Sequence, residues 1–138
     1  MSYLLDTNVI SEHTRPKPDE AVVNWLRGIP NSEQYLSVLT LAEVRYGVER
    51  LTSGARRESL RVWLDGDVVE RFADRLVPIS AAVAERWARL RVEVGRSVPA
   101  VDSLIAATAL HHDLRLVTRN ARDFAHFPGL VVVNPWEM

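Results

Sequence analysis

Short runs of consecutive apolar residues recur along the chain, and stretches with helical spacing separate them. The runs show little alternation of apolar and polar residues, which is typical of strands that are covered on both faces of a parallel sheet. We expect five strands, over residues 3–5, 35–38, 76–79, 114–117 and 130–133. Pro78 has no amide hydrogen to donate to a neighbour, so the third strand should lie at an edge of the sheet or end there.

Apolar residues that recur three or four positions apart predict helices between these strands. The predicted helices follow Asp19, cover residues 40–51, residues 59–72 and residues 101–112, and include a long helix that Ser80 caps. Gly66 weakens the prediction over 59–72, because glycine is a poor helix former. Strands and helices that alternate in this way favour an α/β domain with a mostly parallel sheet. No repeat or linker divides residues 1–138, so we expect a single domain.

The composition excludes several kinds of site. The chain has 138 residues and no cysteine, which rules out disulfides, zinc–thiolate sites and thiol nucleophiles. The apolar run near the N-terminus stops at Asp6, which is too early for a secretory signal or a membrane span. A cytoplasmic protein that does not contact a membrane is therefore the expectation.

The overall charge gives no indication of a nucleic-acid partner. The formal net charge is −1, from 17 basic and 18 acidic residues. Lys17 is the only lysine, so nearly all the basic residues are arginines. Arginine binds phosphate well because its planar guanidinium donates two parallel hydrogen bonds, but codon usage in a G+C-rich genome would produce the same bias.

Four acidic residues stand just after a predicted strand or at the start of a predicted helix. They are Asp6 in LLDTN, Glu43 in TLAEVRYG, Asp102 in AVDSLIAA and Asp123 in VTRNARDF. In an open α/β sheet, such positions meet at the carboxyl ends of the strands. Each acid also has a structural interpretation: a helix cap for Asp6, a helix dipole contact for Asp102 and a turn for Asp123. Thr40 and Glu43 have the spacing of a capping box.

Acids that gather without a lysine nearby repel one another unless a cation lies among them. Carboxylate oxygens suit Mg²⁺ or Mn²⁺ better than softer metals. Such an ion activates water and stabilises charge on a phosphodiester. The residues by themselves therefore indicate an acidic metal site of a kind that suits phosphoryl chemistry.

Four segments resemble the PIN-domain family, and more specifically the VapC-type toxins of bacterial toxin–antitoxin pairs. They are LLDTNVISE, LTLAEVRYGVERL, VDSLIAATALHHDLRLVTRNARDF and VVVNPW, which together run from residue 3 to residue 136. The resemblance implies a three-layer α/β/α domain that binds Mg²⁺ or Mn²⁺ and cleaves RNA as an endoribonuclease. It also implies a homodimer, a cognate VapB-type antitoxin, and contact with operator DNA only through the antitoxin complex.

The same resemblance implies roles for particular residues. It implies that Asp6, Glu43 and Asp102 are catalytic metal ligands and that Asp123 is the fourth. The polar turns after the first and fourth strands become supporting residues, namely Thr7, Asn8, Thr118 and Asn120. Arg45, Arg119 and Arg122 flank the acids and are candidates for holding phosphate, and Val62 and Trp63 are candidates for a partner surface.

Two other functions compete with a ribonuclease. A phosphoacceptor signalling domain of the receiver type also has acids at strand ends, but it needs a lysine after its last strand, and this chain has none there. A catalytically silent PIN-like module would act with its antitoxin in binding operator DNA. The intact set of acids disfavours this second alternative, and a metal-dependent cleavage assay distinguishes it.

Overall fold

Five short strands form one sheet at the centre of the molecule. The computed structural model describes all 138 residues. The strands are β1 (Tyr3–Leu5), β2 (Gln34–Ser37), β3 (Leu76–Val77), β4 (Arg115–Val117) and β5 (Val132–Val133). Their order in the sheet is β3-β2-β1-β4-β5, and every neighbouring pair is parallel. The predicted parallel sheet is thus confirmed, and β3 lies at an edge, as its following Pro78 indicated.

Eight α-helices surround the sheet. They are α1 (Thr7–Ser11), α2 (Glu20–Arg27), α3 (Val38–Glu49), α4 (Ala55–Val62), α5 (Val69–Arg71), α6 (Ala81–Val94), α7 (Ala100–His111) and α8 (Ala121–Phe124). Short 3-10 turns cover Glu12–Thr14 and Asn31–Glu33, and a π-helical segment covers Trp63–Val68. No helix is both long enough and apolar enough to cross a membrane.

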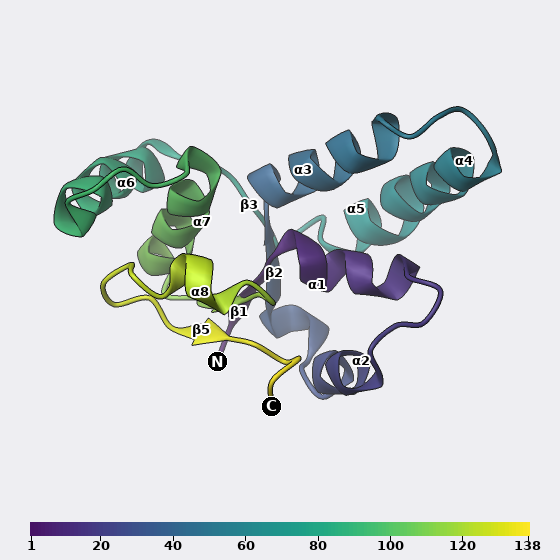
Figure 1. Cartoon of the computed structure of the whole chain (residues 1–138), viewed down its shortest axis with the longest axis horizontal. Coiled ribbons are helices and arrows are strands. Elements are labelled where there is room, and N and C mark those ends of the chain that lie inside the picture. Colours follow the sequence, from purple (N-terminus) through teal and green to yellow (C-terminus); the bar gives the residue numbers. More distant parts are fainter.

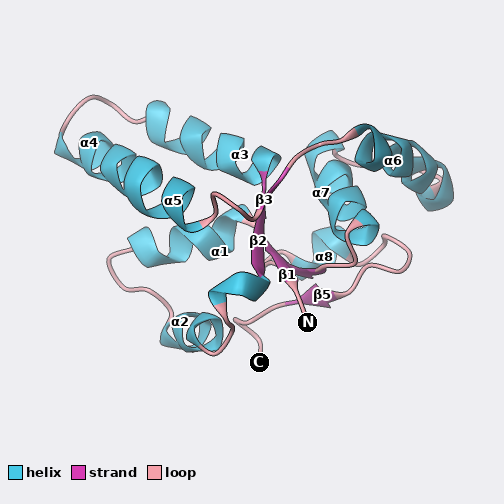
Figure 2. Ribbon diagram, turned by 180° about the vertical axis from the view of Figure 1, so that it is seen from behind, coloured by secondary structure: helices cyan, strands magenta, loops and turns pink.

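The helices lie in two layers, one on each face of the sheet. Helices α1 to α5 lie on one side and α6 to α8 on the other, with the strands between them (Figures 1 and 2). The molecule is therefore a three-layer α/β/α domain, as the resemblance implied.

Successive strand residues supply the two cores in turn, because side chains alternate between the faces of a sheet. Leu5 and Val117 belong to the cluster beneath α1 to α5, whereas Leu4 and Leu116 belong to the cluster beneath α7 and α8. These four side chains are at most 1% exposed. This burial on both faces explains why the strands appear in the sequence as unbroken apolar runs.

The predicted helix over 59–72 is longer and less regular than expected. Helix α4 starts earlier, at Ala55, and leads without interruption into the π-helical segment and α5. Gly66 lies inside the π-helical segment, so the residue that weakened the prediction marks a change of helix type. Single π turns within α-helices accommodate such local irregularities.

Candidate acidic metal centre

The sheet order reverses between β1 and β4, and the polar residues that end these two strands lie side by side. The amide of Asp6 donates to the carbonyl of Val117 at 2.9 Å, which continues the ladder one residue beyond β1. Asp6 and Thr118 therefore meet at the carboxyl edge, although 112 positions separate them. Open α/β sheets bind ligands at this kind of reversal point.

Both carboxylate oxygens of Asp6 accept hydrogen bonds, which fix its orientation. Oδ1 accepts from the amide of Thr7 at 2.8 Å, so Asp6 is the N-cap of α1 as its sequence position suggested. Oδ2 accepts from the hydroxyl of Thr118, also at 2.8 Å. Capping a helix and taking part in a site are therefore compatible roles for Asp6.

Thr118 connects the two polar turns. Its side chain is fully buried, and its Oγ1 accepts from Asn8 Nδ2 at 3.4 Å and from the amide of Asn120 at 3.1 Å. Asn8 Oδ1 in turn accepts from the amide of Arg119 at 3.1 Å. The structure thus brings the supporting residues predicted in these turns into one network with Asp6. Asn120 contributes its backbone amide to this network.

Glu43 lies on α3, which leaves the carboxyl end of β2. The hydroxyl of Thr7 donates to Glu43 Oε1 at 3.4 Å. The capping-box interpretation of Glu43 is wrong, because α3 starts at Val38 and its cap is Ser37, whose Oγ accepts from the amide of Leu39 at 3.1 Å. Thr40 is buried inside the first turns, with its hydroxyl unpaired. Helix capping therefore does not account for Glu43.

Asp102 stands in the first turn of α7, where the sequence placed it. The indole Nε1 of Trp87 donates to Ser103 Oγ at 2.8 Å, and that hydroxyl donates to the carbonyl of Ala100 at 2.9 Å. These bonds from α6 hold the turn that carries Asp102. They also engage the Ser103 hydroxyl both as an acceptor and as a donor.

Two of the acids have carboxyl groups that hold their protons more tightly than usual. Partial burial raises the pKa of Glu43, and the charges of Asp6 and Asp102 raise it further, while the bond from Thr7 lowers it. Partial burial also raises the pKa of Asp102, as do the charges of Asp6 and Asp123. The charges of Asp6 and Asp102 therefore act on Glu43, and those of Asp6 and Asp123 act on Asp102.

No arginine or lysine forms an ion pair with any of these four carboxylates. In this side-chain arrangement, no three acidic or histidine side chains come close enough together to hold a metal ion. The centre is thus a group of mutually repelling carboxylates, defined by their electrostatic proximity.

One neighbour of the centre, His126, was not predicted from the sequence. The charge of His126 opposes the rise in the pKa of Asp102, which places the imidazole near that carboxyl. Its Nε2 is buried without a hydrogen-bond partner. The one signal in the sequence is its position three residues after Asp123, where the chain leaves α8.

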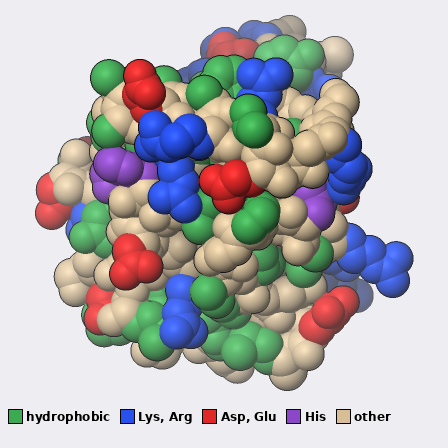
Figure 3. Space-filling view, turned by 90° about the vertical axis from the view of Figure 1, so that its left-hand side faces the viewer, with side chains coloured by type: hydrophobic (Ala, Val, Ile, Leu, Met, Phe, Trp, Pro, Cys, Tyr) green, Lys and Arg blue, Asp and Glu red, His purple; other side chains and the backbone are tan.

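The flanking arginines behave differently from one another. Arg45 forms ion pairs with Glu49, at 3.7 Å, and with Asp65, so two acids already engage its charge. Arg119 is exposed and lies over the ring of Trp136, with 5.5 Å between the guanidinium carbon and the ring centroid. The face that includes α6 mixes arginines with acids, without a broad patch of one sign (Figure 3). Any attraction for phosphate must therefore be local.

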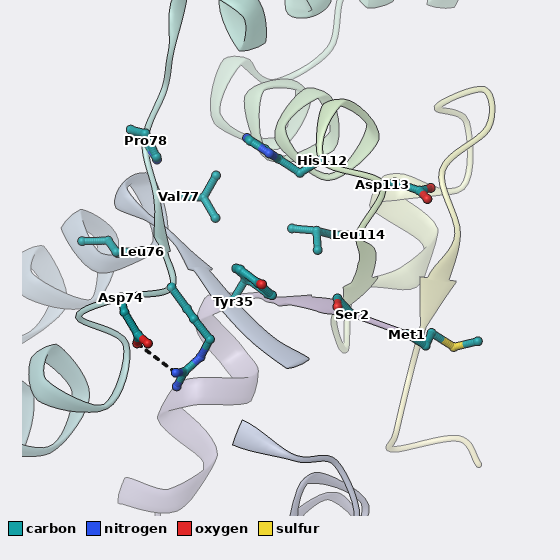
Figure 4. A pocket seen from close by; sticks show the side chains of 11 residues that line it. Met1, Ser2, Tyr35, Asp74, Leu76, Val77, Pro78, His112, Asp113 and Leu114 are labelled. Carbon is teal, nitrogen blue, oxygen red and sulfur yellow. Dashed lines mark hydrogen bonds and ion pairs between the residues drawn. The ribbon is translucent and has the colours of Figure 1, made fainter. Parts of the chain in front are cut away.

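A hollow of about 530 Å³ lies at the amino ends of the strands, away from the carboxyl edge that carries Asp6 (Figure 4). Its lining includes Ser2, Arg75 and Leu114, each of which comes just before or at the start of a strand. Arg75 is held there by an ion pair with Asp74 at 2.9 Å and by its bond to the carbonyl of Gln34 at 2.8 Å. None of the four acids of the proposed centre lines this hollow.

Comparisons with known proteins define the class of this fold and site. The family model for the PIN domain matches residues 3–130. The toxin FitB of Neisseria gonorrhoeae is 40% identical over 136 residues, which cover 96% of this chain and 97% of FitB. The VapC ribonuclease Y4jK of Sinorhizobium fredii is 36% identical over 137 residues, 97% of each chain.

A solved structure shows the same architecture. The structure of FitAB bound to an IR36 DNA fragment contains a chain that superposes with a TM-score of 0.93 at 38% identity. The match covers 99% of this chain and 96% of the other. The chain therefore belongs to the PIN-domain family.

Proposed function

We propose that this protein is a metal-dependent endoribonuclease, the toxin of a toxin–antitoxin pair. The observation that carries the proposal is the group formed by Asp6, Glu43 and Asp102 at the reversal point of the sheet. These carboxylates act on one another electrostatically, and none has a basic partner. The relative named a VapC ribonuclease supports RNA as the substrate.

The donor set of the acidic centre fits Mg²⁺ or Mn²⁺. Asp6, Glu43 and Asp102 would hold the ion, with Asp123 as a fourth ligand, because all offer hard carboxylate oxygens. A bound divalent ion activates water and stabilises the charge that develops on a phosphodiester. Thr118 and Thr7 orient Asp6 and Glu43 through hydrogen bonds, as outer residues do around metal ligands.

The proposed partners are a second copy of the chain and a VapB-type antitoxin, with operator DNA bound through the antitoxin complex. The DNA-bound FitAB structure supports the last part of this proposal. Val62 is 73% exposed and is available to a partner. Trp63 packs partly against the core beneath α1 to α5, so it is less available than the sequence suggested.

The test is cleavage of total RNA with Mg²⁺, with Mn²⁺ and with EDTA. We expect cleavage only with a metal ion, and Asp6→Asn should lower its rate about a hundredfold or more, as when a major electrostatic group is lost. Asparagine also caps helices, so this variant should fold as well as the parent. Glu43→Gln should lose activity similarly, because its carboxylate has no structural partner except Thr7.

Melting curves supply an independent measurement. Mg²⁺ should raise the melting temperature of the parent by binding to the native state, and it should raise that of Asp6→Asn less. If both variants cleave RNA at the parental rate, the acids are structural and the nuclease proposal is wrong. If the parent binds operator DNA with its antitoxin but cleaves no RNA, the silent-module alternative is correct.

A further inference from the structure

A second hollow adjoins the acidic centre, and one face of α3 forms its wall. Positions 43, 46, 47 and 50 share a face of the helix, because residues three and four apart are neighbours on an α-helix. The hollow has a volume of about 450 Å³. Its lining residues are Thr7, Leu39, Ala42, Glu43, Tyr46, Gly47, Arg50 and Val101.

Tyr46 exposes its aromatic ring to this hollow. The side chain is 68% exposed, and its hydroxyl makes no hydrogen bond within the protein. The guanidinium carbon of Arg50 lies 5.7 Å from the centre of the ring. Unlike Arg45 on the same helix, Arg50 has no acidic partner, so its charge is available to a ligand.

The rest of the lining leaves the ring accessible. Gly47 follows Tyr46, and a Cβ added there would meet nothing within 4 Å. Leu39, Ala42 and Val101 provide small or apolar walls. A flat apolar group can therefore reach the ring and lie against it.

The hollow is continuous with the acidic centre, since Thr7 and Glu43 belong to both. We propose that Tyr46 and Arg50 form a subsite for the nucleotide next to the scissile phosphate of single-stranded RNA. Tyr46 stacks on the base, and Arg50 binds an adjacent phosphate. Aromatic rings and arginines recognise unpaired RNA in this manner. The inference rests on the proposed function and adds the place and chemistry of substrate recognition.

RNA suits the chemistry of this hollow. A strand of RNA alternates flat bases with negative phosphates, and the hollow offers a flat ring beside an unpaired positive charge. A protein partner seated here would have to place an acidic side chain opposite Arg50, because a buried charge without a partner is costly.

The test measures binding of fluorescein-labelled oligoadenylate by anisotropy, in Mg²⁺ and in the Asp6→Asn background to prevent cleavage. The affinity of each variant is also measured for strands in which one nucleotide lacks its base. We expect Tyr46→Ala to weaken binding of the intact strand about tenfold, within the range for one stacked base, and Tyr46→Phe to retain it. With the base removed at the stacked position, Tyr46→Ala should have no further effect.

Arg50→Gln should weaken binding of both strands equally and lower the salt dependence of binding. The matched controls lie on α6: Arg91→Gln removes another exposed arginine that lies over an aromatic ring, and Val92→Ala removes another exposed apolar side chain. Both should bind like the Asp6→Asn parent. In the cleavage-competent protein, Tyr46→Ala should raise KM and leave kcat nearly unchanged, because stacking acts before and during the reaction alike.

Two results would overturn the subsite. If Tyr46→Ala binds every strand as the parent does while the unmodified protein still cleaves RNA, the subsite is absent and the nuclease proposal stands. If light scattering shows that Tyr46→Ala converts a dimer to a monomer, a second copy covers this face. Failure of the unmodified protein to cleave any RNA would instead refute the proposed function itself.

Discussion

At the scale of single residues, Thr118 is the side chain on which most of the centre depends. One buried hydroxyl donates to Asp6 and accepts from Asn8 and from the amide of Asn120. A buried polar group that loses its hydrogen-bond partner destabilises the fold, because nothing replaces the hydrogen bonds it made to water in the unfolded chain. The threonine therefore holds the polar turns together and also fixes the direction of one carboxylate.

Thr118→Val tests this role. Valine has nearly the same shape but leaves three polar groups without their common partner, so we expect a loss of about 1–3 kcal/mol in the free energy of unfolding. Cleavage should fall as well, because Asp6 loses one of its two fixed contacts. Thr118→Ser keeps the hydroxyl and should retain most of both properties. A valine variant as stable and active as the parent would show that the network is dispensable.

At the scale of secondary-structure elements, the start of α3 decides where Glu43 lies. The sequence T-x-x-E suggests that the helix begins at Thr40, but it begins at Val38 after the cap Ser37. Ser37 and Thr40 are both fully buried, and only Ser37 Oγ has a partner in capping. The earlier start moves Glu43 out of the capping position and into the helix that lines the centre.

The two hydroxyls should consequently differ in their effect on stability. Ser37→Ala removes the cap and should cost about 1 kcal/mol in the free energy of unfolding. Thr40→Val removes a buried hydroxyl that has no partner, so the variant should be as stable as the parent or more stable. Denaturant unfolding of both variants checks this. The reverse order would restore the capping box and with it the structural interpretation of Glu43.

At the scale of the whole molecule, the repulsion among the acids should appear in the pH dependence of folding. The pKa values of Glu43 and Asp102 are raised in the native state, from ordinary values of 4.5 and 3.8. Between the ordinary and the raised pKa, the native state therefore binds more protons than the unfolded state. This contribution makes the metal-free protein less stable as pH rises through that interval.

Asp102→Asn removes part of this contribution. We expect the melting temperature of the variant, relative to the parent, to increase as pH rises from about 4 towards neutrality in EDTA. Mg²⁺ at neutral pH should raise the melting temperature of the parent more than that of the variant. A difference between the two proteins that stays constant with pH would mean that Asp102 is not repelled by its neighbours.

The weak overall charge makes RNA binding depend on a few arginines, and Arg119 is a candidate because it is exposed beside the polar turns. Arg119→Ala should weaken RNA binding and lower the slope of log affinity against log salt by about one unit. Arg45→Ala is the control. Arg45 forms ion pairs with Glu49 and Asp65, so this substitution should leave the slope unchanged. Equal slopes for all three proteins would remove Arg119 from the RNA contact.

The sequence by itself was sufficient for the architecture, and the role of the four acids stays a prediction from it. Apolar runs such as those ending at Leu5 and Val117 identify strands because both faces of this sheet are buried, and that property is local to each run. Local patterns also located the cap Ser80, whose side chain accepts from the amide of Val83, three residues further along the chain.

Tertiary structure alone decided how these residues meet. The bond between Asp6 and Thr118, the proximity of His126 to Asp102 and the pairing of Arg45 with Asp65 join distant segments, and no local pattern encodes such distances. The start of α3 also depends on the end of β2, because burial of Ser37 in the sheet places its hydroxyl at the first helical amides. The hollow beside Tyr46 arises in the same way, since the approach of α1 and α7 to α3 supplies its remaining walls.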